Sequence, residues 1–183
     1  MKIESLQSLF VDELKDAYDF EHQLLEALPK MAAHAHDTEL QNGFRQHLEQ
    51  TKGHVDRLEK VFNEIGERPE RRECEGMKGL IKEGEQVVKA RGDDAACDAA
   101  LISAAQRVEH YEMAAYGTLC AFADALGRAN QSKLLGQILD QEKQTDEKLS
   151  KLAEARVNPR AIDGGSAGSR PGAEAAARSA KPH

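Results

Sequence analysis

The segment AAQRVEHYEMAAYGTL, residues 104–119, carries apolar residues every three or four positions and two glutamates among them. This spacing follows the turn of an α-helix, so the segment predicts an amphipathic helix. Glu109 lies four residues after Ala105, and Glu112 lies four residues after Val108. Because residues four apart share a helix face, both carboxylates are expected to point toward the protein interior, one turn apart.

The same periodicity continues on both sides of this segment and predicts four long helices and one short helix. The long helices are expected over about 3–34, 38–65, 94–126 and 129–154, and the short one over about 73–90. Pro29 is expected to kink or interrupt the first helix. Thr38 is expected to cap the second helix and Gly66 to end it.

The lengths of the connections indicate how these helices are arranged. Short links join the first two long helices and the last two, so each pair is expected to form an antiparallel hairpin. Residues 67–94, between the two pairs, are too numerous for a tight turn. A long connection at this place is typical of a ferritin-like bundle, where it crosses from one end to the other. We therefore predict an all-α fold, a ferritin-like four-helix bundle with an additional short helix in the crossover between helices two and three.

The composition of the 183 residues agrees with this fold class. Only 4% are aromatic and none is Trp, which argues against an all-β sandwich or barrel. Residues 1–154 are expected to form one ferritin-like helical domain. Residues 155–183 are rich in Gly, Ser, Pro and Ala and lack periodicity, so a disordered tail is expected there.

Charge and hydropathy indicate the cellular compartment of the protein and the kinds of partner that it is expected to bind. No apolar run approaches the roughly 20 residues that span a bilayer, and the acidic N-terminus does not resemble a signal peptide. We therefore expect a cytoplasmic protein with no membrane partner. The net charge of -7 argues against nucleic acid as a partner, although the weakly basic tail leaves a DNA-associated stress protein as an alternative.

Polar residues interrupt the apolar face of every long helix near the middle of its length. On the first helix, Glu21 follows Leu14 by seven residues, which places it among the core leucines. The same criterion places His47 on the buried face of the second helix, and Glu142 and Asp146 on that of the fourth. An acid or an imidazole from each of the four helices is therefore expected at one level of the core.

These buried acids need a counter-charge. A lone ionised carboxylate in a dry core costs several kcal/mol, and converging carboxylates also repel one another. No Lys or Arg shares these faces at the same level, because four nearby basic residues are all expected to face outward: Lys15, Lys52, Arg107 and Lys143. Metal cations are therefore the better explanation, and carboxylates together with an imidazole suit iron or manganese.

The ligand set differs from that of the usual di-iron bundle, which takes one Glu from each of two helices and Glu-x-x-His from each of the other two. Glu21 and Glu112 fit the two single glutamates. Glu142 fits a third, with Asp146 in place of the imidazole. The second helix offers His47 but no glutamate on the same face.

Three further residues lie close to this ligand set. Glu109 is expected to be either a further metal ligand or a hydrogen-bond partner of one. His54 shares a helix face with His47 but is expected to be structural or exposed. Tyr18, one turn from Glu21, is expected to pack in the core, to donate a hydrogen bond to a ligand carboxylate, or to lie in an electron path.

Four segments resemble the YciE/YciF family of bacterial stress proteins, a branch of the ferritin-like superfamily. They are HLEQT (47–51), GLIKEGE (79–85), AAQRVEHYEMAAYGTL (104–119) and LDQEKQTDEKL (139–149). The resemblance covers about residues 3–154. It implies a ferritin-like bundle, a dinuclear iron site, a homodimer and a role in general or osmotic stress, but no settled reaction. Family members often carry Glu where this chain has Gln50, so the resemblance supplies no carboxylate ligand from the second helix.

The residues and the resemblance together predict a stress protein with two iron ions, or manganese, in the core of the bundle. Such a site suits ferrous oxidation with sequestration, peroxide reduction, or a manganese catalase-like dismutation. Fold analogy does not choose among these reactions of iron, O2 or peroxide, so enzymatic activity stays an open question. The alternative is a non-enzymatic helical scaffold or dimeric interaction module, in which the inward polar residues bond to one another.

Overall fold

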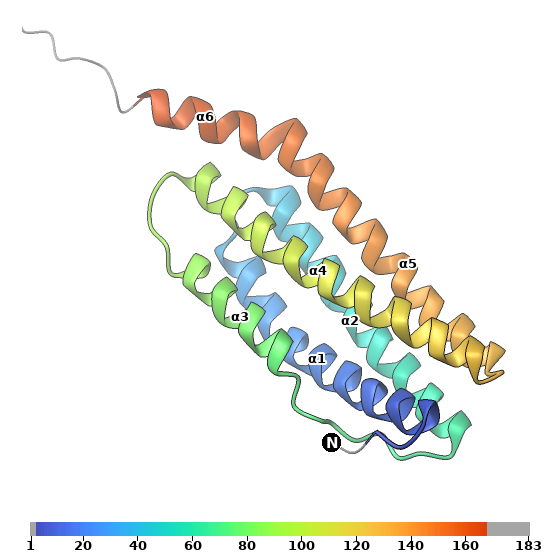
Figure 1. Ribbon diagram of the computed structural model, residues 1–183. Helices are drawn as coiled ribbons and strands as arrows, with labels where there is room; N and C mark the ends of the chain where they lie inside the picture. Colours follow the sequence, from blue (N-terminus) through green and yellow to red (C-terminus); the bar gives the residue numbers. More distant parts are fainter. Residues whose placement is uncertain (1–2, 168–183) are drawn as a thin grey trace, which may run out of the picture.

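Every element of regular structure in residues 3–167, the part of the chain that the computed structural model describes, is helical (Figure 1). This confirms the predicted all-α fold. α1 continues through Pro29, so the expected interruption is absent. No helix within these residues is long and apolar enough to cross a membrane. The elements are α1 (Leu6–His34), α2 (Thr38–Ile65), α3 (Glu75–Val88), α4 (Asp94–Ala125), α5 (Ala129–Leu152), a π-helical turn (Ala153–Val157) and α6 (Asn158–Ala167).

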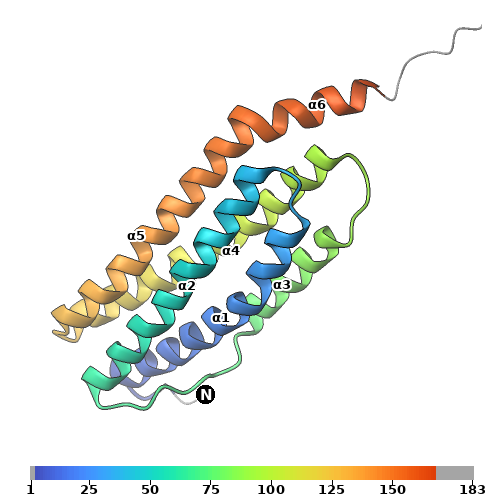
Figure 2. The same ribbon diagram turned by 180° about the vertical axis from the view of Figure 1, so that it is seen from behind.

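The four long helices pack as two antiparallel hairpins, α1 with α2 and α4 with α5. Contacts of α2 with α5 and of α1 with α4 close the bundle. α3 lies along the outside against α1 and α4, and it returns the chain so that α4 begins at the end where α2 begins (Figure 1 and Figure 2). The long crossover predicted from the sequence is therefore present, with the short helix in it.

Local hydrogen bonds explain where α2 begins and ends. Asp37, and not Thr38 as expected, is the N-cap, since its carboxylate accepts from the backbone N–H groups of Glu39 and Leu40 at 2.8 and 3.4 Å. The residue just before a helix is the one whose side chain reaches these free N–H groups. Gly66 ends the helix, as expected, with a φ of 77° that glycine adopts without strain.

Apolar side chains fill the bundle on both sides of a polar layer. Leu14 and Leu28 lie seven residues before and after Glu21 on α1, and all three side chains are buried. Residues seven apart project from the same side of a helix, so Glu21 lies between two apolar levels of the core. Phe10 and Phe62 are among the fully buried side chains, each of which stabilises the fold by roughly 1.5–3 kcal/mol.

The chain stays helical where the sequence predicted the start of a disordered tail. The π-helical turn and α6 carry the helix on from α5 as far as Ala167. The expected boundary at residue 154 is thereby corrected, because the helix extends at least 13 residues further. Residues 168–183 of the expected tail lie outside the described residues.

Contacts with the start of α2 order this segment. Val157 is 2% exposed, so the π-helical turn contributes a side chain to the core. Arg156 and Arg160 both donate hydrogen bonds to Asp37 Oδ2, at 2.6 and 3.0 Å. These contacts are made with residues distant in the chain, which explains why local composition did not reveal them.

Candidate metal centre

Polar side chains from all four long helices meet in one layer of the core. They point inward because each lies on the apolar face of its helix. None is more than 3% exposed. The layer consists of Glu21 from α1, His47 and His54 from α2, Glu109 and Glu112 from α4, and Glu142 from α5.

These residues form two groups that share Glu142. The first group is His47, Glu109, Glu112 and Glu142, and the second is Glu21, His54 and Glu142. Within each group, one nitrogen or oxygen atom per residue lies within 4.8 Å of the others. Both groups therefore have the dimensions of a metal-binding site.

The carboxylate of Glu142 faces both groups at once. Its Oε2 atom lies 3.8 Å from Nε2 of His47, and its Oε1 atom lies 3.0 Å from Nδ1 of His54. A carboxylate with its two oxygens directed at two sites is placed to bridge two metal ions. This geometry makes the pair of groups a candidate dinuclear centre.

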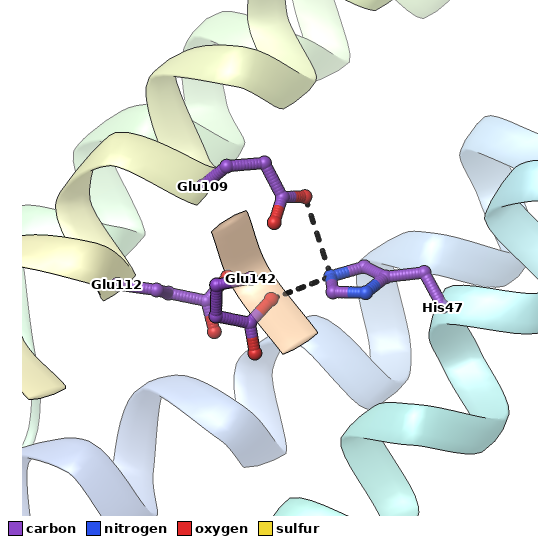
Figure 3. A group of neighbouring side chains, drawn as sticks. All are labelled: His47, Glu109, Glu112 and Glu142. Carbon is purple, nitrogen blue, oxygen red and sulfur yellow. Dashed lines mark ion pairs between the residues drawn. The ribbon is translucent and has the colours of Figure 1, made fainter. Parts of the chain in front are cut away.

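The first group brings three carboxylates around one imidazole, as Figure 3 shows. Nε2 of His47 lies 3.3 Å from Oε1 of Glu109, and the carboxylates of Glu112 and Glu142 lie beside them. Oxygen ligands with one imidazole suit iron or manganese, whereas a zinc or copper(I) site would be expected to use thiolates or more imidazoles.

The second group is smaller and is held by a tyrosine. Oε1 of Glu21 lies 3.3 Å from Nδ1 of His54, and the same oxygen accepts a hydrogen bond from the hydroxyl of Tyr116. Tyr116 is fully buried, and its ring lies 5.7 Å from that of Phe20 in an edge-to-face arrangement. This packing fixes the phenol and thereby the orientation of the Glu21 carboxylate.

The tautomer of His54 follows from its neighbours. Its Nε2 atom lies 3.0 Å from Oε1 of Gln141, which also accepts a hydrogen bond from Nη1 of Arg57 at 2.9 Å. Arg is only a donor, so the Gln141 atom between them is the oxygen and His54 Nε2 carries a proton. In neutral His54 the lone pair of Nδ1 therefore faces Glu21 and Glu142. That arrangement is repulsive unless a proton or a metal ion lies between the three groups.

Buried polar atoms without a hydrogen-bond partner are concentrated in this layer. They include both oxygens of Glu112, both ring nitrogens of His47, and Oγ1 of Thr51. Each buried polar atom left unpaired costs about 1–3 kcal/mol. Carboxylate oxygens and imidazole nitrogens are donors that iron and manganese accept, so the residues present fit these metals.

The carboxyl groups of this layer differ in acidity. Burial, followed by the charge of Glu142, raises the pKa of Glu109 and of Glu112 well above the ordinary 4.5. Burial also raises the pKa of Glu21, although the charge of His54 opposes the shift. In the absence of metal, these acids therefore hold protons to a higher pH than free glutamate.

Glu142 and His54 shift in the directions expected of an ion pair. Burial acts to raise the pKa of Glu142, but the hydrogen bond from His54 and the charge of His47 hold it below the ordinary value. Burial acts to lower the pKa of His54, but the charge of Glu21 and the hydrogen bond with Glu142 raise it to about 10. A metal ion that binds here displaces the proton on His54 Nδ1.

Asp146 lies apart from the other residues singled out in the sequence. It belongs to neither group, its side chain is 21% exposed, and its Oδ1 atom accepts a hydrogen bond from Gln106 at 3.0 Å. Nε2 of His110 lies 3.5 Å from the same oxygen. Four residues after Glu142, Asp146 is turned about 40° further around α5, and this rotation directs it to the edge of α4.

His54 belongs to the polar layer, although its sequence position did not predict this. It was expected to be structural or exposed, yet it is fully buried and belongs to the second group. Its spacing of seven residues from His47 was the available signal, since both project from one side of α2. With Thr51, it forms Thr-x-x-His where a usual di-iron bundle has Glu-x-x-His.

Tyr18 packs against the core, the first of the roles expected of it, and Tyr116 is the tyrosine that donates a hydrogen bond to a candidate ligand. The hydroxyl of Tyr18 donates to Glu59 at 2.8 Å, so it does not contact a residue of either group. Tyr116, four residues after Glu112 on the buried face of α4, is the tyrosine that contacts Glu21. Its four-residue spacing from Glu112 was the signal in the sequence.

The basic residues face outward, as predicted. Lys15 pairs with Glu70, Lys52 with Glu49, and Arg107 with Glu83, all at the protein surface. Within the described residues, no Lys or Arg side chain reaches the two groups. The acids of the layer are therefore not neutralised by lysine or arginine side chains.

The sequence matches a known family over most of its length. The model of a domain of unknown function, DUF892, matches residues 5–162. Protein YciF of Escherichia coli strain K12 is 41% identical over 162 residues, which are 88% of this chain and 98% of YciF.

Solved structures show the same fold. The crystal structure of the E. coli stress protein YciF matches with a TM-score of 0.82 and 41% identity, over 85% of this chain and 98% of that one. YcfI of Rhodopseudomonas palustris matches with a TM-score of 0.80 and 38% identity, over 81% and 95%. A protein of Xanthomonas campestris, 21% identical, shares the fold with a TM-score of 0.68 over 87% and 98%. The chain therefore belongs to the DUF892 family, and its resemblance to stress proteins of the YciF type is confirmed.

Proposed function

We propose that this protein is a ferritin-like stress protein that binds two iron ions, or manganese, in the polar layer of its bundle. The observation that carries the proposal is the placement of Glu142, whose two oxygens face two separate groups of buried ligands. The unpaired buried atoms of these groups support it, because a bound cation satisfies them together.

The roles of the side chains follow from the two groups. Glu21 and His54 would hold one ion, His47, Glu109 and Glu112 would hold the other, and Glu142 would serve both. A redox-active metal pair supplies one-electron chemistry toward O2 or peroxide, or toward ferrous iron as a substrate. The protein's own residues supply the orientation, through Tyr116 on Glu21 and Gln141 on His54, and the dry surroundings.

Metal content of the full-length protein, purified from cells supplied with iron and with manganese, tests this proposal. We expect about two ions per chain in the wild type, about one in Glu21→Gln, and almost none in Glu142→Gln, because only Glu142 serves both groups. The matched control is Glu49→Gln, an exposed glutamate on α2, which should keep two ions.

A different result would support the non-enzymatic scaffold. In that case the protein contains no metal, and Glu142→Gln destabilises it whether or not metal is added, because the substitution leaves His54 without its buried ion-pair partner. Thermal unfolding of the same four proteins with and without added metal separates these outcomes. Only the metal-binding protein gains stability from the ion, and it loses that gain in Glu142→Gln.

A further inference from the structure

Thr51 is a polar side chain of the buried layer to which the proposed function gives no role. Its side chain is 0% exposed, and its Oγ1 atom has no hydrogen-bond partner among the described residues. Thr51 follows His47 by four residues and precedes His54 by three, so all three project from one face of α2. The hydroxyl therefore lies between the two imidazoles along the helix, at the level of the two groups of candidate ligands.

Two other helical threonines show how such a hydroxyl is usually satisfied. Thr118 and Thr145 each donate to the backbone carbonyl oxygen four residues earlier, at 2.9 and 3.0 Å. This bond within the helix is common for threonine. Thr51 does not make it, so its hydroxyl keeps a free donor inside the core. Because a buried hydroxyl without a partner destabilises a fold, this donor points to a partner from outside the chain.

The second group of candidate ligands offers an ion fewer donor atoms than the first. It consists of three residues, Glu21, His54 and Glu142, against four in the first group. Glu142 directs one oxygen to each group, and Tyr116 already donates a hydrogen bond to one oxygen of Glu21. Iron and manganese accept more donor atoms than three, and reactive metal sites keep such positions open for a ligand from solution. An ion held by the second group therefore has positions left for a small molecule.

The charge of the layer indicates which kind of small molecule binds there. Two ferrous ions carry as much positive charge as the carboxylates of the two groups carry negative charge, whereas two ferric ions carry an excess. Uncompensated charge is costly in a buried site, so the oxidised pair of ions favours an anion from solution. The carboxylates of the two groups are those of Glu21, Glu109, Glu112 and Glu142.

We propose that the hydroxyl of Thr51 donates a hydrogen bond to a small anion, of the type of peroxide, that binds at the second group. Thr51 precedes His54 by three residues, where a usual di-iron bundle has the glutamate of Glu-x-x-His. The shorter hydroxyl supplies a hydrogen-bond donor there in place of a further carboxylate ligand, and a bond from a hydroxyl to an anion is among the stronger hydrogen bonds. This inference rests on the proposed function, because the anion needs the bound ion.

Titration of the iron-loaded, oxidised, full-length protein with azide tests the proposal. Azide is a small anion that accepts hydrogen bonds, and its binding to ferric iron produces an absorption band. Thr51→Val keeps the shape of the side chain and removes the hydroxyl, so it should weaken azide binding about tenfold or more. The same variant should keep about two ions per chain, because the hydroxyl is not a metal ligand. Thr51→Ser keeps the hydroxyl and should bind azide as the wild type does.

A matched variant controls for the loss of a threonine hydroxyl from a helix. Thr118→Val makes the same change at an exposed position of α4, where the hydroxyl is bonded to the backbone. It should bind azide as the wild type does. Thermal unfolding of the metal-free proteins provides a second measurement that is independent of iron. Thr51→Val should unfold at a temperature at least as high as that of the wild type, because it removes an unpaired buried hydroxyl.

Three results would overturn the proposal while leaving the proposed function intact. The first is an azide affinity that Thr51→Val does not change. The second is the loss of an ion from Thr51→Val, since the hydroxyl would then be a metal ligand itself. The third is a metal-free Thr51→Val that unfolds at a lower temperature than the wild type, since the hydroxyl would then have a partner within the chain. A wild-type protein that binds no iron would overturn the proposed function and this inference together.

Discussion

Gln141 and Arg57 lie outside the two groups of candidate ligands, yet they determine which nitrogen of His54 faces these groups. Arg57 orients the amide of Gln141, and the amide oxygen then accepts the Nε2 proton of His54. Hydrogen-bond partners of this kind commonly increase the metal affinity of a histidine ligand about 10–100-fold. The geometry of the second group of candidate ligands therefore depends on a residue outside the group.

Replacement of Gln141 tests this dependence. In Gln141→Met the proton of His54 is free to occupy Nδ1, so the affinity of the second group should fall about 10–100-fold while that of the first group is kept. Titration with manganese followed by calorimetry resolves the two sites. Gln144→Met, at an exposed position of the same helix, is the control, and equal losses in both variants would rule out the positioning role of Gln141.

At the scale of the elements, the loop between α1 and α2 connects three helices through Asp37. Its carboxylate caps α2, accepts from Arg156 and Arg160 of the C-terminal helical segment, and is 3% exposed. Its backbone N–H donates to Oδ2 of Asp98 on α4 at 2.7 Å. Besides capping its helix, Asp37 therefore joins α2 to α4 and to the C-terminal helical segment.

Comparison of two caps isolates this additional contribution. Asp93 caps α4 through a single bond from the N–H of Ala96 at 2.9 Å, so Asp93→Ala should cost about 1 kcal/mol. Asp37→Ala also removes the partner of two partly exposed arginines and should cost about 2 kcal/mol. Urea unfolding gives both values. Equal losses would show that the contacts of Arg156 and Arg160 with Asp37 contribute nothing to the stability of the bundle.

At the scale of the whole molecule, the acids of the polar layer make stability depend on pH. The pKa values of Glu109 and Glu112 are raised in the folded state, so their favourable contribution is complete below about pH 4.5 and is lost as the pH rises. His54, raised to about 10, acts in the same direction between its ordinary 6.5 and that value. Glu142, which is lowered, destabilises the fold only toward acid pH.

The metal-free protein should therefore lose stability between about pH 5 and about pH 9, and bound metal should reverse this trend. Metal ions replace protons on the same atoms, so the stabilisation by manganese should increase with pH. Urea midpoints across this range, with manganese or with a chelator, provide the measurement. The double variant Glu109→Gln and Glu112→Gln should show a flatter pH profile without metal, and an unchanged profile would contradict this account.

Most of the helices and their bounds could be predicted from the sequence. The bounds of α2 agree with the expectation at both ends, and α4 and α5 agree within one or two residues. Glu21, Glu112 and Glu142 were placed inward by spacing alone. This works because each residue turns by a constant angle around the helix axis, so spacing within one helix determines the face on which a side chain lies.

Other features depend on neighbours that are distant in the chain. Asp146 and His54 both follow a predicted inward residue at helical spacing, yet only His54 reaches the polar layer. The rotation of α5 against α4 gave Asp146 a partner in Gln106, and the approach of α5 to α2 gave His54 one in Gln141. The helical extension to Ala167 likewise makes contacts with Asp37, a residue distant in the chain.

Periodicity thus assigned this chain its helices, its bundle and its inward acids, because these properties follow from spacing within one helix. Packing between helices selected which of the polar residues meet and which nitrogen of an imidazole faces them. The reason is physical: burial on a helix face is a property of the segment, whereas the distance between two side chains is set by the angle and rotation at which whole helices pack.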